Sequence, residues 1–336
     1  MQKSQDLSPE AVLSIKNLSI EFPIYKGSVK ALNGVSLEVY PGEIVGLVGE
    51  SGSGKSVTAM MSNRLIAEDA YRVKEGTIHL LGKNILSCPE SDMLAIRGKQ
   101  IAMIFQEPMT ALNPVMKVGK QLLGVILRHQ SISTQAAKDK AIKLLRDMEI
   151  GDPEQVFNSY PFELSGGMRQ RIMIALAFSC DPQLLIADEP TTALDVTVQK
   201  QVLLLLKNRA LQTGTAILLI THDLAVVSQF CERVYVMYAG SIVEEGLTQE
   251  VLYTPKHPYT RGLLAGLPEK ALAGEELSTI PGQVPNLAQL PEGCSFMGRC
   301  VERQEICHQR PSLLKINPSS QHKTACWVVQ QEVINE

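Results

Sequence analysis

The chain has 336 residues, of which 45% are hydrophobic and 20% are charged, and its formal net charge is −3. This composition is that of a globular protein with a full apolar core, and the length favours one large domain with an appendage. The near-neutral charge lacks the basic excess that is typical of nucleic-acid-binding proteins, so we expect no nucleic acid partner.

The longest apolar runs in the chain are short. They include Val202–Leu206 and Ala216–Ile220, whereas a membrane-spanning helix needs about 18 to 20 residues. The first residues also lack the apolar centre of a secretory signal. We therefore expect a protein of the cytoplasm that reaches a membrane only through its partners.

The N-terminal part of the chain has the pattern of a sheet. Apolar and polar residues alternate between residues 12 and 40, which predicts antiparallel strands with one face toward solvent. Segment 23–29 within this stretch is expected to be a long loop. The apolar run Glu43–Val48 predicts a buried strand, and Gly76–Leu81 predicts another.

A glycine-rich segment directly follows the strand predicted at 43–48. It matches the phosphate-binding pattern G-x4-G-K-[ST] between a strand and a helix. Small residues let the backbone N–H groups surround an anion, and the helix adds the positive end of its dipole. Lys55 would reach the β- and γ-phosphates, and the Ser56 hydroxyl would bind Mg²⁺. The predicted ATP-binding residues here are Gly49, Glu50, Ser51, Gly52, Ser53, Gly54, Lys55, Ser56 and Val57.

Residues 110–165 or so have a different character. Apolar side chains occur there at helical spacing with charged residues between them, which predicts an amphipathic helix. These apolar residues are Ala137, Ala141, Leu144, Leu145 and Met148. The stretch is interpreted as a helical insertion in an α/β domain.

A second buried strand also ends in chemically useful residues. Gln183–Ala187 is apolar and leads into Asp188 and Glu189. Asp188 would bind the metal, and the adjacent Glu189 would polarise the attacking water as a general base. Ala216–Ile220 predicts a further buried strand, and residues 234–244 predict a hairpin that turns at Ala239-Gly240.

After about residue 255 the chain becomes rich in proline, and four cysteines gather near its end. We therefore predict an ATPase domain at 12–254, with its helical part at about 110–165, and a small C-terminal module at 255–336. The cysteine spacing C-x5-C-x6-C-x18-C matches neither a zinc finger nor a common ferredoxin. Metal ligation and free structural thiols are both compatible with it. The cysteines are Cys294, Cys300, Cys307 and Cys326.

One motif separates this chain from other phosphate-loop ATPases. Leu164-Ser165-Gly166-Gly167 resembles the signature of ABC transporters, and it is followed by Met168 where the family has Gln. Phe105-Gln106 resembles the Q-loop, Thr192–Asp195 the D-loop, and Thr221-His222-Asp223 the H-switch. Over residues 12–250 the chain thus resembles the ATP-binding subunits of ABC transporters. The resemblance implies an α/β P-loop NTPase fold with a RecA-like core, an antiparallel β subdomain and a helical subdomain.

The resemblance also implies a head-to-tail dimer, in which the signature of one subunit covers the ATP of the other. A serine and two glycines at the start of a helix form an anion site that suits this role. Adenine would stack on Phe22, favoured by spacing, or on Tyr25. The implied roles are catalysis by Glu189, His222 and Gln106; Mg²⁺ binding by Ser56, Gln106 and Asp188; partner ATP at Ser165, Gly166 and Gly167; and a D-loop contact by Asp195.

The C-terminal part narrows the resemblance. Three segments resemble the ATPase subunits of bacterial dipeptide and oligopeptide importers, and among these a D,D-dipeptide branch: His257–Leu264, Ile280–Pro285 and Tyr160–Glu189. This implies a second ATPase subunit, expected to be a paralogue, two transmembrane permeases and an extracytoplasmic peptide-binding protein, at the cytoplasmic face of the inner membrane. It also favours a [4Fe-4S] cluster on the four cysteines over zinc or unligated thiols.

Three other functions are compatible with parts of this pattern. Related importers carry nickel chelates or glutathione. Soluble ABC ATPases act on DNA or ribosomes, but these usually have two cassettes or a long coiled coil, which this sequence lacks. A non-catalytic regulatory cassette is disfavoured because Lys55, Asp188, Glu189 and His222 are all present.

Overall fold

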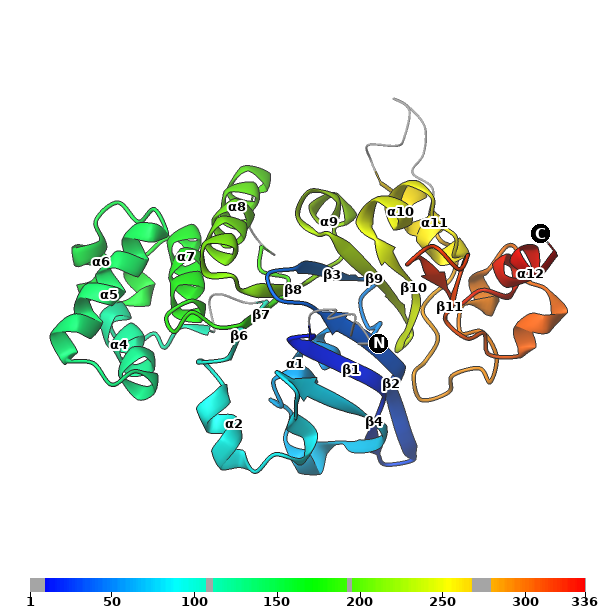
Figure 1. Ribbon diagram of the computed structural model, residues 1–336, viewed down its shortest axis with the longest axis horizontal. Helices are drawn as coiled ribbons and strands as arrows, with labels where there is room; N and C mark the ends of the chain where they lie inside the picture. The colour runs from blue at the N-terminus through cyan, green and yellow to red at the C-terminus, as the bar shows by residue number, and fades with distance from the viewer. Residues whose placement is uncertain (1–9, 107–110, 192–194, 268–278, 336) are drawn as a thin grey trace, which may run out of the picture. The chain divides into compact units, whose positions relative to one another are not determined.

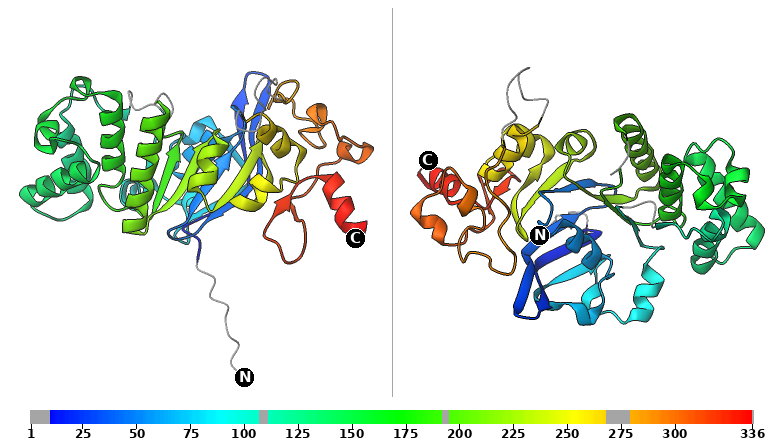
Figure 2. Two further views of the ribbon diagram at one scale, coloured as in Figure 1. Left: turned by 90° about the horizontal axis from the view of Figure 1, so that it is seen from above. Right: turned by 180° about the vertical axis from the view of Figure 1, so that it is seen from behind.

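The computed structural model describes residues 10–106, 111–191, 195–267 and 279–335 (Figure 1; Figure 2). The described residues form two compact units, each assembled from separate stretches of the chain. Unit 1 holds residues 10–13, 38–43 and most of 79–219, and unit 2 holds 14–37, 44–78 and most of 220–335. The D-loop residues 192–194 lie outside the described part of the chain. The domain limits 254/255 stay a prediction.

The strands predicted between residues 12 and 40 are present as β1 (Leu13–Ile24) and β2 (Gly27–Val39). β1 is hydrogen-bonded to β2 on one side and to β4 (Arg72–Leu80) on the other. The long loop expected at 23–29 is wrong. Both strands continue into that segment, and only Tyr25 and Lys26 separate them, with Gly27 at φ 107° directly after the turn.

The second sheet of unit 2 carries the glycine-rich loop. β3 (Ile44–Val48) pairs in parallel with β9 (Arg233–Tyr238), and β9 pairs antiparallel with β10 (Ser241–Leu247). All five residues of β3 are buried, as the apolar run predicted. The predicted hairpin turns at Ala239 and Gly240, whose φ angles of 44° and 80° suit the turn that joins two twisted strands tightly.

The C-terminal segment extends this same sheet. β12 (Lys323–Thr324) pairs antiparallel with β10 and with β11 (Leu314–Lys315). The helices of unit 2 are α1 (Lys55–Ser62), α9 (Leu224–Phe230), α10 (Thr248–Tyr253), α11 (Pro258–Ala265) and α12 (Trp327–Asn335). Short 3-10 turns lie at Glu68–Ala70, Met297–Arg299 and Glu305–His308.

Unit 1 contains the other buried strands. β6 (Ile101–Ile104) pairs in parallel with β7 (Leu184–Asp188), and most of β8 (Ala216–Thr221) belongs to the same unit. Every residue of β7 and β8 is buried, which explains their unbroken apolar sequence. Unit 1 also holds β5 (Lys83–Asn84), the 3-10 turns Ile85–Ser87 and Pro161–Glu163, α2 (Glu90–Ile96), α7 (Gly166–Ala177) and α8 (Val196–Thr213).

The helical insertion is formed by α4 (Val118–His129), α5 (Thr134–Asp147) and α6 (Pro153–Asn158) (Figure 1). The Ser133 hydroxyl caps α5 by accepting a hydrogen bond from Ala136 N at 3.2 Å. All of the apolar residues predicted on one face of this helix are buried. Within the described residues, no helix is both long and apolar enough to cross a bilayer.

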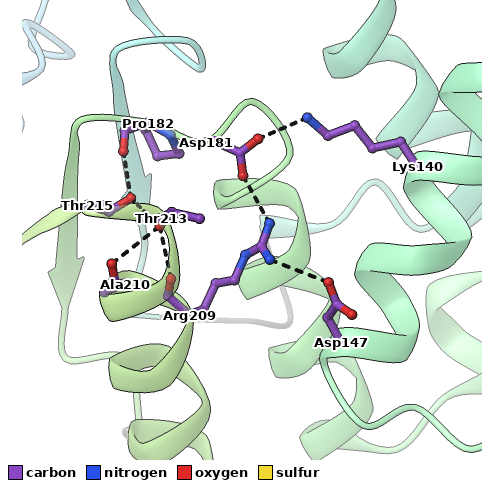
Figure 3. A network of polar contacts seen from close by, with 8 residues as sticks. All are labelled: Lys140, Asp147, Asp181, Pro182, Arg209, Ala210, Thr213 and Thr215. Carbon is purple, nitrogen blue, oxygen red and sulfur yellow. Dashed lines mark hydrogen bonds and ion pairs between the residues drawn. The ribbon is translucent and has the colours of Figure 1, made fainter.

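Ion pairs join this helical part to the loop before β7 (Figure 3). Asp181 in that loop accepts from Lys140 of α5 at 3.1 Å and from Arg209 of α8 at 2.9 Å. Arg209 also lies 3.4 Å from the Asp147 carboxylate at the end of α5. One half-buried guanidinium therefore connects two helices to the segment that leads into the acidic end of β7.

Candidate nucleotide-binding site

The glycine-rich loop turns sharply where β3 ends. Gly49 has φ 153°, and a Cβ there would lie 2.1 Å from Met237 O. Gly54 has φ 107°, and its Cβ would lie 2.8 Å from Ala31 O. Side chains are therefore excluded at both ends of the loop, because backbone of neighbouring strands approaches it closely.

Lys55 is the first residue of α1, and the fold buries it to 6% exposure. Its ammonium donates to Gly49 O at 2.9 Å and to Glu50 O at 3.0 Å. The charge is thus held over the loop that the sequence predicted to bind phosphate. Ser56, the predicted Mg²⁺ ligand, follows on α1 and is exposed.

Glu50 has contacts that the sequence did not predict. Its carboxylate accepts two hydrogen bonds from Arg299, at 2.6 and 3.1 Å, and its N–H donates to the Tyr259 hydroxyl at 2.8 Å. Both partners are more than two hundred residues away in sequence, at separations of 249 and 209. The sequence around Glu50 does not indicate either contact, because both partners are distant along the chain.

The acidic site lies at the end of β7 in unit 1. Asp188 is 5% exposed, and Glu189 has φ 46°, a left-handed conformation that is costly for a glutamate. The Gln106 amide donates to the Glu189 carboxylate at 2.9 Å, so two of the predicted catalytic residues lie side by side. Such strain gathers at functional sites, where the surrounding structure holds it in place.

The signature residues form the start of α7, also in unit 1. Ser165 is the N-cap, and its hydroxyl accepts a hydrogen bond from Met168 N at 3.3 Å. Ser165 and Gly166 are exposed, and the first N–H groups of a helix have no partner within that helix. Met168 contributes its backbone to the cap, so the absent Gln does not disturb this geometry.

The remaining predicted residues are distributed over both units. His222 is exposed directly after β8, and the next residue, Asp223, caps α9 by accepting from Ala225 N at 2.8 Å. Asp195 caps α8 by accepting from Val198 N at 3.0 Å. Phe22 is half-buried on β1, whereas Tyr25 is 98% exposed. Stacking of either ring on adenine stays a prediction.

The four C-terminal cysteines line one cavity of unit 2. Its wall includes Cys294, Cys300, Cys307 and Cys326, together with the rings of Phe296 and Trp327. The cavity has a volume of about 10 Å³, room for about one water molecule. Within the described part of the chain, no three His, Cys, Asp or Glu side chains are grouped as they would be around a single metal ion.

Three of the thiols in this cavity favour their neutral form. Burial, followed by the neighbouring cysteines, raises the pKa of Cys294 to about 11, and burial also raises the pKa of Cys300 and Cys326. His257 lies in the same wall, and burial lowers its pKa to about 4, so its ring is neutral at pH 7. A metal would have to displace protons from these thiols.

Three features together define a nucleotide-binding cassette. They are the loop that holds Lys55 against its own carbonyls, the acidic end of β7, and the glycine-containing start of α7 that Ser165 caps. Residues 32–192 match the family model of ABC transporters, and residues 243–307 match that of the oligopeptide/dipeptide transporter C-terminal region. The chain belongs to the ABC transporter family, as an ATP-binding subunit with ATPase activity, and carries this second region.

Two ATP-binding proteins of peptide transporters match nearly the whole chain. A probable D,D-dipeptide transport ATP-binding protein of Escherichia coli K12 is 56% identical over 326 residues, covering 97% of this chain and 99% of its own. A dipeptide transport ATP-binding protein of Bacillus subtilis is 45% identical, covering 96% of each chain. The structure of a dimeric ATP-binding cassette bound to ADP and phosphate is similar, with a TM-score of 0.62 and 26% identity over 70% of this chain and 98% of that one.

Proposed function

We propose that this chain binds and hydrolyses MgATP to power the import of dipeptides or oligopeptides across the bacterial inner membrane. The observation that supports the proposal is the loop of residues 49–56, in which the Lys55 ammonium lies against the loop carbonyls at the start of α1, as expected of a loop that binds a triphosphate. The peptide substrate is inferred from the relatives, which are dipeptide transport ATP-binding proteins whose sequences match almost the entire chain.

The proposed chemistry assigns one role to each group. Lys55 and the loop N–H groups bind the phosphates, and Ser56 with Asp188 and Gln106 would hold Mg²⁺. Glu189 polarises the attacking water, and His222 contacts the γ-phosphate. In a head-to-tail dimer, Ser165, Gly166 and Gly167 complete the site of a second subunit, as the exposed N-terminus of α7 allows.

The proposed partners follow from the same assignment. The chain would pair with a paralogous ATPase, dock beneath two permeases at the cytoplasmic face of the membrane, and depend on an extracytoplasmic binding protein. Deleting the gene in an amino-acid auxotroph is expected to abolish growth on di- and tripeptides that contain the required amino acid, and a plasmid copy is expected to restore it. Unchanged peptide growth with lost nickel or glutathione uptake would favour the related importers instead.

We also propose a [4Fe-4S] cluster on the four C-terminal cysteines. Cysteine thiolates are the usual ligands of such a cluster, and four of them surround one cavity here. The cavity has room for about one water molecule, so the four side chains would have to move apart to admit a cluster.

Metal analysis tests the cluster directly. Protein purified without oxygen is expected to contain about four iron atoms and four sulfides per chain, and Cys307→Ser is expected to lose most of both because one ligand is missing. Cys231→Ser is the control, since Cys231 is also buried but does not line the cavity. One zinc per chain, or no metal in freshly purified protein, would contradict the proposal.

A further inference from the structure

The glycine-rich loop is held in place by residues far away in the sequence as well as by its own residues. Glu50, its second residue, is fixed at its N–H by Tyr259, at its carbonyl by Ser53 N at 3.2 Å and Lys55, and at its carboxylate by Arg299. Only the carbonyl contacts come from the loop itself. The other contacts come from segments near residues 259 and 299, in the same unit.

The Arg299 side chain is built into its position. It is 6% exposed, and besides Glu50 it donates to Pro281 O at 2.9 Å and Ile280 O at 3.3 Å. It also lies 5.8 Å from the centre of the Tyr238 ring, within the range of a cation–π contact. A guanidinium fixed in this way presents a rigid fork that matches a carboxylate with two hydrogen bonds.

The Tyr259 side chain is also fixed in position by its neighbours. Its side chain is fully buried, with its ring 4.6 Å from that of Tyr238 and 5.4 Å from that of Phe296. α11 begins at this point because the neutral His257 ring accepts a hydrogen bond from Tyr259 N at 3.0 Å. Packing therefore directs the hydroxyl at the loop, and burial raises the pKa of Tyr259, which keeps the hydroxyl protonated.

We propose that Arg299 and Tyr259 are positioning residues for the phosphate-binding loop, and that both act through Glu50. We call the contacts of Glu50 with Arg299 and Tyr259 the tether. A loop held in its binding conformation loses less entropy when the nucleotide binds, so the tether raises the affinity for ATP. Arg299 also neutralises a carboxylate that stands in a loop for a polyanion, which would otherwise repel the phosphates. The inference rests on the proposed binding of ATP by residues 49–56.

The cysteine cavity lies next to this tether. Arg299 is the last residue of the 3-10 turn Met297–Arg299, between Cys294 and Cys300. Cys294 N donates to Cys307 O at 2.9 Å, which closes the segment against the following turn. The same short segment thus contributes side chains to the cavity and the guanidinium to the loop.

The test measures MgATP affinity of the full chain by calorimetry, using a slowly hydrolysed ATP analogue. Arg299→Gln is expected to raise the Kd about tenfold, because it removes the tether and leaves the Glu50 carboxylate without its counter-charge. Glu50→Gln and Tyr259→Phe are each expected to raise it about threefold, the effect of one hydrogen bond. Arg303→Gln, an exposed arginine in the same segment, is the control and is expected to bind like the wild type.

The double variant separates a positioning role from a general structural one. Adding Glu50→Gln to Arg299→Gln removes the uncompensated carboxylate, so the Kd is expected to fall back toward that of Glu50→Gln alone. A Kd in Arg299→Gln equal to the wild type would overturn the proposal, as would a double variant no better than Arg299→Gln. If Arg299→Gln fails to fold in thermal melts, unchanged affinity in both Glu50→Gln and Tyr259→Phe overturns it equally.

Lys55→Ala is included to separate the two proposals. If that variant binds the nucleotide like the wild type, the proposed ATP site itself fails. If Lys55→Ala loses binding while the Arg299 and Tyr259 variants keep it, the site stands and only the positioning role is excluded.

Discussion

Glu189→Gln is expected to lower ATP turnover by about 100-fold or more, because a positioned carboxylate contributes roughly that factor in proton transfer. The amide keeps the shape of the side chain and its contact with Gln106, so nucleotide binding is expected to persist. Without hydrolysis the bound ATP should keep the dimer closed. Peptide uptake would then stop although the chain is still present and loaded with nucleotide.

The measurement follows phosphate release from the assembled transporter and the ATP that remains bound after gel filtration. Glu154→Gln is the matched control, an exposed glutamate of α6 in the same unit, and is expected to turn over normally. Rapid hydrolysis by Glu189→Gln would show that another group activates the water. Loss of nucleotide binding in the same variant would instead show that Glu189 supports the fold of the site.

The elements that could be predicted are those whose cause is local. β3, β7 and β8 are fully buried strands, and short unbroken apolar runs predict them. The amphipathic stripe predicted α5, and the Ala239-Gly240 turn was visible as a break between two apolar runs. The sharp turn between β3 and α1 was also predicted, because Gly49 and Gly54 adopt backbone conformations in which other residues would clash.

The features that escaped prediction depend on contacts across the chain. Segment 23–29 contains Pro23 and Gly27, which suggested a loop, but pairing of β1 with β2 extends both strands to a two-residue turn. The contact of Glu50 with Arg299 joins residues 249 positions apart, and no periodicity reports it. Tyr259 was noticed only as part of a C-terminal motif, without any sign that its hydroxyl meets the loop.

The proposed catalytic residues were predictable in part. The resemblance to ABC transporters implied that Gln106 and Glu189 act at one site, and in the structure their side chains are in contact. It did not predict the left-handed backbone of Glu189, because nothing in the residue type favours φ 46°. The following Pro190 favours extended backbone at Glu189, so the residue types at the end of β7 do not predict a left-handed conformation there.

Lys55→Met is expected to weaken MgATP binding by about 100-fold, because one buried cation would no longer meet the triphosphate charge. In the present arrangement the ammonium is held by Gly49 O and Glu50 O, two neutral acceptors that a γ-phosphate can readily replace. Lys16→Met, an exposed lysine of β1, is the control and is expected to keep full affinity.

Lys55→Arg then separates charge from geometry. Lys55 is the first residue of α1 and 6% exposed, so a larger planar group has little room there, and arginine is expected to restore no more than a small part of the lost affinity. Full recovery with arginine would mean that net charge alone attracts the nucleotide. Nucleotide binding would then require neither the sharply turned backbone that Gly49 and Gly54 permit nor the tether at Glu50. This variant therefore tests whether the geometry of the loop, and not its charge alone, determines the affinity.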